Sequence, residues 1–174
     1  AVEVQCSPRE HTYKILNAAT VLDGEKIINP KTAKGVVMGG MSMGIGLGSR
    51  EYFQYGTHGG ILNSSFRTYK VIRFGEQPDY LVEFVETPAI NGPYGARGFG
   101  EHGILGIPAA LANALSRAVG IDIDEVPINP ELIWRLKGGS KGMIPFDFEY
   151  YKPDTTEGAV DIFMDLHSQG KLPM

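Results

Sequence analysis

Two kinds of hydrophobic pattern run along the chain, and each predicts a different kind of element. Short runs rich in β-branched and aromatic residues predict strands at Val2–Val4, Tyr13–Leu22, Ile61–Thr68 and Tyr80–Glu86. Asp23-Gly24-Glu25 is typical of a turn and ends the second of these strands. We therefore expect a sheet that is built from the first half of the chain.

Longer apolar stretches predict helices. Asn29-Pro30 favours a helix start, because asparagine can cap and proline has no amide hydrogen to leave unpaired, so a helix is expected over Pro30–Phe53. Thr87–Gly100 is rich in proline and glycine and is predicted to be a loop. Further helices are expected over Gly103–Val119 and Pro130–Leu136. These elements predict an α+β fold, in which a mixed sheet is packed by the first two of these helices.

The end of the chain differs from the rest in composition. Gly138–Gly142 has the glycine content of a linker, and beyond it Phe146–Tyr151 predicts a strand and residues 154–168 a helix. A strand and a helix of this length bury too little apolar surface to fold alone. The predicted division is a main domain over residues 1–138, a linker over 139–142 and a short strand–helix tail over 143–174.

Composition and charge exclude several classes of protein. The 16 basic and 20 acidic residues form no basic block, which argues against a nucleic-acid partner, and the chain has no apolar stretch long enough to span a membrane. Cys6 is the single cysteine and the four histidines are scattered, so we expect no protein-ligated metal and a reducing, cytoplasmic compartment. The chain has neither a signal-peptide pattern nor an initiator methionine, and we expect it to be a piece of a longer protein.

Glycine accounts for 23 of the 174 residues and is concentrated in two windows. Eight glycines lie between Gly39 and Gly60 and six between Gly92 and Gly106, so the two windows hold 14 of the 23. Apolar residues interleave in both windows, which is not the pattern of a flexible linker. Glycine permits close approach to the backbone. The sequence leaves open whether the approaching group is a packed element of the protein or a ligand.

Glu101 is the strongest candidate for chemistry. It lies within Gly98–Gly103, between the predicted loop and an apolar helix. A carboxylate at this place can simply be favoured by the helix dipole, or it can be a general base that a ligand reaches between segments without side chains. The same six residues match the G-x-G-x-x-G pattern of dinucleotide-binding folds, but Thr87–Arg97 separates them from the nearest predicted strand.

Several segments, in the same order, resemble one enzyme family. Asn91–Glu101 is similar to the Gly-Pro-aromatic-Gly-Ala-Lys/Arg-Gly-x-Gly-Glu stretch of the xanthine dehydrogenase/aldehyde oxidase family of molybdenum hydroxylases. Ile28-Asn29-Pro30, the glycine-rich stretch Gly39–Gly46 and the segment Asn63–Lys70 resemble further segments of that family. Residues 1–138 thereby resemble the C-terminal lobe of the molybdopterin-binding subunit.

The resemblance implies a reaction and its parts. Family members hydroxylate a carbon of an N-heterocycle or an aldehyde with water as the oxygen source. The matching glutamate takes a proton from a molybdenum-bound hydroxyl, which makes Glu101 the implied general base. Met43, Gly44, Gly98 and Gly100 are implied to contact the molybdenum–molybdopterin cofactor, whose site is incomplete in this piece. Electrons leave through iron–sulfur clusters, commonly to FAD, in other modules.

The implied partners are therefore the remaining segments of the molybdopterin domain, the iron–sulfur and FAD modules and a small-molecule substrate. The isolated piece is expected to be inactive. Residues 143–174 resemble the start of the family's FAD-binding subunit and end before its glycine-rich FAD loop. Surfaces left by the missing modules could also support a homo-oligomer.

Two positions depart from the family pattern. Met43 stands where the family usually has a glutamine that contacts the cofactor, and Val36 replaces an earlier glutamine. A thioether cannot make the paired donor and acceptor contacts of an amide. A second interpretation therefore stays open, in which the protein is a non-catalytic homologue that retains the fold for assembly or binding.

Overall fold

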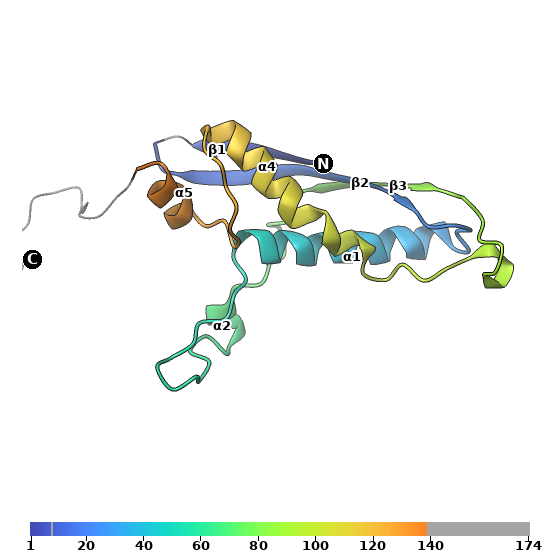
Figure 1. Cartoon of the computed structure of the whole chain (residues 1–174), viewed down its shortest axis with the longest axis horizontal. Helices are drawn as coiled ribbons and strands as arrows, with labels where there is room; N and C mark the ends of the chain where they lie inside the picture. Colours follow the sequence, from blue (N-terminus) through green and yellow to red (C-terminus); the bar gives the residue numbers. More distant parts are fainter. Residues whose placement is uncertain (8, 139–174) are drawn as a thin grey trace, which may run out of the picture. The chain divides into compact units, whose positions relative to one another are not determined.

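The computed structural model describes residues 1–7 and 9–138, and the predicted linker and tail over 139–174 lie outside the described residues. Three strands form one mixed sheet in the order β1 (Val2–Ser7), β2 (Thr12–Asp23) and β3 (Asp79–Val85). β1 is antiparallel to β2, and β3 is parallel to β2 (Figure 1). This arrangement confirms the predicted α+β class with a mixed sheet.

The parallel pair is connected through helix α1 (Pro30–Ser49), which runs along the sheet (Figure 1). The helix begins where Asn29-Pro30 predicts, because the Asn29 side chain accepts a hydrogen bond of 3.1 Å from the Thr32 amide. It ends at Ser49, and the expected extension to Phe53 is wrong. Arg50 leaves the helical conformation with φ −156° and ψ −17°.

The strand predicted at Ile61–Thr68 is wrong. After α1 the chain leaves the body of the domain as an arm, which carries the four-residue helix α2 (Phe66–Tyr69) (Figure 1). The arm is held by the buried Asn63 side chain. Its Oδ1 accepts from the Gln54 amide at 2.8 Å, and its Nδ2 donates to the Tyr52 carbonyl at 2.6 Å. These bonds replace the ladder that a strand would have needed.

The predicted helix Gly103–Val119 is divided into α3 (His102–Leu105) and α4 (Ile107–Val119). Pro108 causes the division, because proline has no amide hydrogen and its ring does not fit behind a preceding helical turn. Gly120 ends α4 in the left-handed conformation with φ 72°. Helix α5 (Pro130–Leu136) has the predicted bounds and is capped by the preceding asparagine.

The core lies on one face of the sheet and has two adjoining parts. The first is made by α1, the sheet and the start of α4, with Ala18, Val37, Met41, Ile45, Val82 and Ile107 buried. The second is made by α4, α5 and the segment between them, with Leu111, Leu115, Ile123, Ile128, Leu132 and Ile133 buried. Val2 and Ile15 of the sheet contact both parts.

None of the described helices is both long enough and apolar enough to cross a bilayer.

Candidate functional site

Three glycines of α1, each one turn apart, face the segment that follows Glu101. A Cβ atom on Gly40 would lie 3.1 Å from Cα of Gly103, and one on Gly44 would lie 2.9 Å from the Ile104 carbonyl oxygen. A Cβ on Gly48 would lie 3.2 Å from Cα of Pro108. Helices α3 and α4 therefore pack directly on the backbone of α1. At these three glycines, the group that approaches the α1 backbone is therefore a packed element of the protein, namely α3 and α4, and not a ligand.

Other glycines of the two windows face open space. A Cβ atom on Gly39, Gly98 or Gly100 would meet nothing within 4 Å among the described residues. Among the hydrogen bonds of the described residues, none is donated by the backbone amides of residues 98–101. The loop in front of α3 thus presents bare backbone and free amide groups, which a ligand can approach.

Glu101 occupies the N-cap position of α3, and its side chain makes no capping hydrogen bond. The residue is exposed. Two residues later, Gly103 is buried so closely against α1 that its Cβ would meet the Val37 carbonyl oxygen. Glu101 is therefore fixed at its C-terminal side by a packed glycine, while its carboxylate is free for another partner. The capping role that a carboxylate can have at a helix start is not used here.

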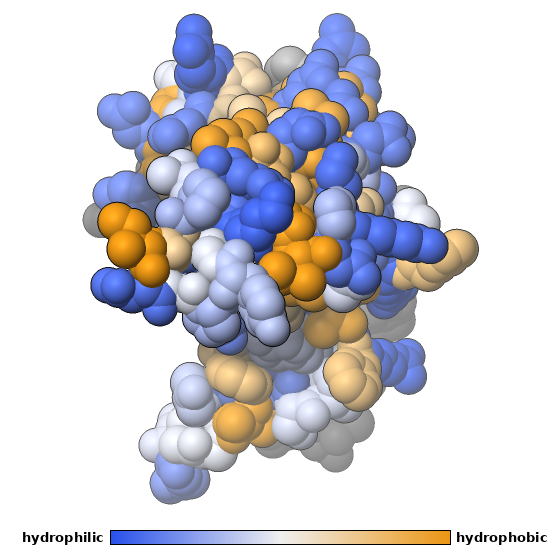
Figure 2. Space-filling view, turned by 90° about the vertical axis from the view of Figure 1, so that its right-hand side faces the viewer, coloured by the Kyte–Doolittle hydropathy of each residue, from blue (hydrophilic) through white to orange (hydrophobic). Residues whose placement is uncertain are grey.

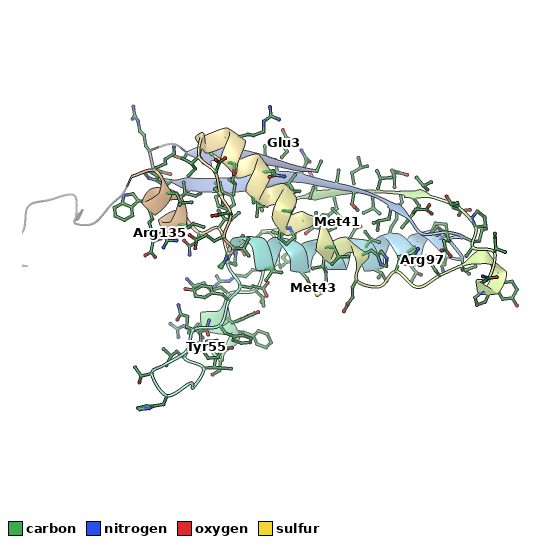
Figure 3. All side chains as sticks on the ribbon, viewed as in Figure 1. Glu3, Met41, Met43, Tyr55, Arg97 and Arg135 are labelled. Carbon is green, nitrogen blue, oxygen red and sulfur yellow. The ribbon has the colours of Figure 1, made fainter. Side chains whose placement is uncertain are left out.

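The other residues that the family resemblance implies as cofactor contacts differ in their exposure. Gly98 and Gly100 lie in the open loop before Glu101, whereas Gly44 is buried under α3 and α4. Met43 is 55% exposed, on the side of α1 opposite the buried Met41 (Figure 3). Its assignment as a cofactor contact, like that of the three glycines, stays a prediction.

Two hollows of the described surface lie elsewhere. One of about 340 Å³ lies between α4 and residues 123–126, and one of about 360 Å³ lies on the arm between Phe53 and Tyr69. Glu101 lines neither of them. No group of three or more histidine, cysteine, aspartate or glutamate residues in the described part of the chain is arranged to hold a metal ion. Because Glu101 is exposed, the candidate site lies on an open surface around the loop.

A polar network connects the loop before Glu101 to the turn between β2 and α1. The Lys26 amide donates to the Gly95 carbonyl at 2.9 Å, and Arg97 pairs with Glu25 at 3.4 Å. Lys26 also pairs with Glu86 at 2.8 Å. The sequence indicated a turn at Asp23–Glu25 but not this connection, because nothing in the residue pattern shows that the turn faces the loop.

Two carboxyl groups of this network have shifted pKa values. Hydrogen bonds from Thr87 and from the Glu25 amide hold the pKa of Asp23 below its ordinary value. The hydrogen bond from Lys26, together with the Ile27 amide, lowers the pKa of Glu86. Both carboxyl groups are thus stabilised in their charged forms.

The dinucleotide-binding alternative lacks its structural context. The G-x-G-x-x-G pattern at Gly98–Gly103 is separated from the end of β3 at Val85 by a loop with a short 3₁₀ turn at Pro93–Gly95. The helix that follows has four residues. A dinucleotide fingerprint requires the glycines directly between a strand and the start of a longer helix, and this chain does not form that unit.

Comparisons with known proteins agree with the fold. Residues 1–78 match a family described as molybdopterin cofactor-binding domain. The chain is 32% identical over 142 residues to the nicotine 6-hydroxylase large subunit of Paenarthrobacter nicotinovorans, which covers 80% of this chain and 17% of that protein. It is 33% identical over 129 residues to the aldehyde oxidoreductase molybdenum-binding subunit PaoC of Escherichia coli. This match covers 73% of this chain and 18% of PaoC.

Solved structures give the same result. The described fold matches quinoline 2-oxidoreductase from Pseudomonas putida 86 with a TM-score of 0.72 and 27% identity, over 76% of this chain and 17% of that one. It matches the aldehyde oxidoreductase of Desulfovibrio desulfuricans with a TM-score of 0.71 and 26% identity. This match covers 78% of this chain and 15% of that one.

The α+β fold of this chain thus agrees with the fold of these solved structures. Residues 1–78 match a molybdopterin cofactor-binding domain, and most of the chain is similar to molybdenum-binding subunits of the aldehyde oxidoreductase and xanthine dehydrogenase type. The chain spans less than a fifth of the length of the curated relatives it matches.

Proposed function

We propose that this domain is the base-bearing part of a molybdenum hydroxylase that hydroxylates a carbon of an N-heterocycle or an aldehyde, with water as the oxygen source. Glu101 is the general base. The observation that carries the proposal is an uncapped, exposed carboxylate on a bare glycine loop, in a chain similar to molybdenum-binding subunits. Iron–sulfur clusters and FAD, in other modules, take up the electrons.

The residues around Glu101 fit a bulky pterin cofactor. Gly98 and Gly100 leave open space where side chains would otherwise stand, and the amides of residues 98–101 are free to donate to its polar edge. Met43 offers an exposed apolar contact on α1. When bound, the molybdenum cofactor supplies the two-electron oxidation. The glycines and free amides of this chain hold and orient it.

Glu101 itself moves a proton. Its carboxylate oxygens carry no hydrogen bond within the helix, so they can accept a proton from an oxygen nucleophile placed beside the loop. The remainder of the subunit would cover the site and exclude water. An exposed apolar side chain close to Glu101 in the sequence is consistent with such a cover, since Leu105, the last residue of α3, is 78% exposed.

The test is Glu101→Gln in the complete enzyme. We expect turnover to fall by about 10²–10⁴-fold, because glutamine cannot accept the proton, while the molybdenum and pterin contents stay unchanged. Glu131→Gln is the matched control, since Glu131 is an exposed carboxylate in the first turn of α5, in a different part of the domain. Unchanged turnover of Glu101→Gln, with both contents intact, would refute the role of Glu101.

A second candidate is a non-catalytic homologue that keeps the fold for assembly or binding. It is favoured by Met43 and Val36, which are 55% and 42% exposed and present no amide at positions where the family usually has glutamine. Metal analysis of the complete protein, produced with ample molybdate, separates the two candidates. Stoichiometric molybdenum supports the hydroxylase, and its absence supports the homologue.

A further inference from the structure

Glu25 has an unusual backbone and an unusual side-chain environment for a turn residue. Its φ is +55°, in the left-handed region that non-glycine residues rarely adopt. Its side chain is 19% exposed, and its Oε2 atom is buried without a hydrogen-bond partner among the described residues. Such features are costly, and they persist where surrounding contacts hold them.

The surrounding contacts come from the loop that precedes Glu101. Glu25 forms an isolated antiparallel bridge with Ala96, and the neighbouring Lys26 amide donates to the Gly95 carbonyl. The Ala89 amide donates to the same carbonyl at 3.1 Å. The turn after β2 and the loop after β3 are therefore one connected structure.

Arg97 extends this structure to the residue next to Glu101. Its Nη1 lies 3.4 Å from Oε1 of Glu25, and its Nη2 lies 3.4 Å from Nε2 of His102. The guanidinium group is a rigid fork, and through its two nitrogens it contacts both Glu25 and His102. His102 is the first residue of α3, directly after Glu101.

We propose that Glu25, acting through Arg97, is a positioning residue for Glu101. The Glu25–Arg97 pair holds the stretch Gly95–His102 against the turn, and the packing of Gly103 on α1 holds its other end. With both ends fixed, the backbone at Glu101 is held in one position, from which its carboxylate can be placed beside the reacting group as a general base requires. This inference rests on the proposed function of Glu101.

The experiment uses the complete enzyme and two measurements. The first is hydrogen exchange of the Lys26 and Ala89 amides, which both donate to Gly95 and therefore report on the loop independently of cofactor or turnover. For Glu25→Gln we expect exchange to become about tenfold faster, because the charged partner of Arg97 is lost. The second is steady-state kinetics, in which kcat should fall by roughly 10–100-fold with KM unchanged, since the base is misaligned but substrate contacts remain.

Two further variants separate positioning from a general loss of structure. Arg97→Lys keeps the charge but not the fork, so it should retain part of kcat, and Arg97→Gln should match Glu25→Gln. The double variant should be no worse than either single one, because both remove the same link. Glu83→Gln is the control, since it breaks the exposed Lys34 pair of similar length, at 3.3 Å, and should leave exchange and kcat unchanged.

Each result decides the proposal. Faster exchange together with reduced kcat and unchanged KM supports it. Unchanged exchange in Glu25→Gln overturns it, and so does faster exchange with full kcat. The proposed function fails separately, if Glu101→Gln retains full turnover. An enzyme that Glu101→Gln inactivates and Glu25→Gln does not affect disproves the positioning role alone.

Discussion

The structure predicts opposite effects on stability for a glycine-to-alanine substitution at two positions of α1. Gly39 faces open space, whereas a Cβ on Gly44 would lie 2.9 Å from both the Ile104 carbonyl oxygen and Cβ of Ile107. Neither position has a positive φ, so alanine is compatible with the backbone at both. Any difference between the two variants therefore comes from the space around them.

The expected change in the free energy of unfolding is the sum of two contributions, the helix propensity of alanine and the cost of overpacking. Alanine in place of a helical glycine gains about 1 kcal/mol at either position. At Gly44 the added methyl group meets backbone that cannot rotate away, and such overpacking costs roughly 1–3 kcal/mol. We expect Gly39→Ala to raise the free energy of unfolding by about 1 kcal/mol, and Gly44→Ala to lower it by up to about 2 kcal/mol.

Urea unfolding followed by far-ultraviolet circular dichroism measures both variants against the parent chain. The midpoints should move in opposite directions with unchanged m-values, because neither substitution alters the surface exposed on unfolding. Gly35→Ala is a second control, since Gly35 also faces open space on α1. If Gly44→Ala is as stable as Gly39→Ala, the close packing of α3 on α1 is wrong.

Two more expectations concern the loop network and the arm. The lowered pKa values of Asp23 and Glu86 mean that their contribution to stability is complete above their ordinary values of 3.8 and 4.5 and is lost as the pH falls through the lowered values. The stability of Asp23→Asn and Glu86→Gln, measured by acid unfolding, should therefore depend less on pH than that of the parent. A pH dependence equal to that of the parent contradicts this. Asn63→Ala removes the buried bonds to Gln54 and Tyr52 and should cost about 1–3 kcal/mol, with faster proteolysis in the arm; an equally resistant arm disproves its role.

Element starts could be predicted from the sequence because their signals are local. Asn29-Pro30 and Asn129-Pro130 each place a cap directly before a proline, and both helices begin there. The mixed sheet also followed from the residue pattern. Pro108 was a local signal too, and it divides a helix that the apolar periodicity alone predicts as continuous.

Tertiary contacts decided the elements that were predicted wrongly. The segment Ile61–Thr68 has strand-forming residues, but Asn63 satisfies the nearby backbone, and the pairing of this segment among the described residues is limited to an isolated bridge between Ile61 and Tyr55. β2 contains an irregularity opposite Glu3 and Val4, which pair with Asn17 and Ile15. This irregularity brings Ile15 and Ala18 to the same core, although strict alternation would place them on opposite faces.

The meaning of the glycines could not be predicted from the sequence, since it depends on the backbone that lies opposite each of them. Figure 2 shows hydrophobic and hydrophilic residues mixed on one end of the domain, so surface character does not mark the site either. Glu101 was predicted as a candidate base from its neighbours in the chain, and this role stays a prediction. The connection from Glu25 through Arg97 was missed, because 72 residues separate the two partners.

The packed and the open glycines have complementary consequences for Glu101. A helix of four residues such as α3 has little stability of its own. Its position therefore depends on the contacts of Gly40 with Gly103 and of Gly44 with Ile104, which fix the chain just after the carboxylate. Gly98 and Gly100, which no side chain covers, leave the approach to the carboxylate open. The role proposed for Glu101 requires a backbone that is rigidly held and a carboxylate that a ligand can reach, and the glycines on both sides of Glu101 provide both conditions.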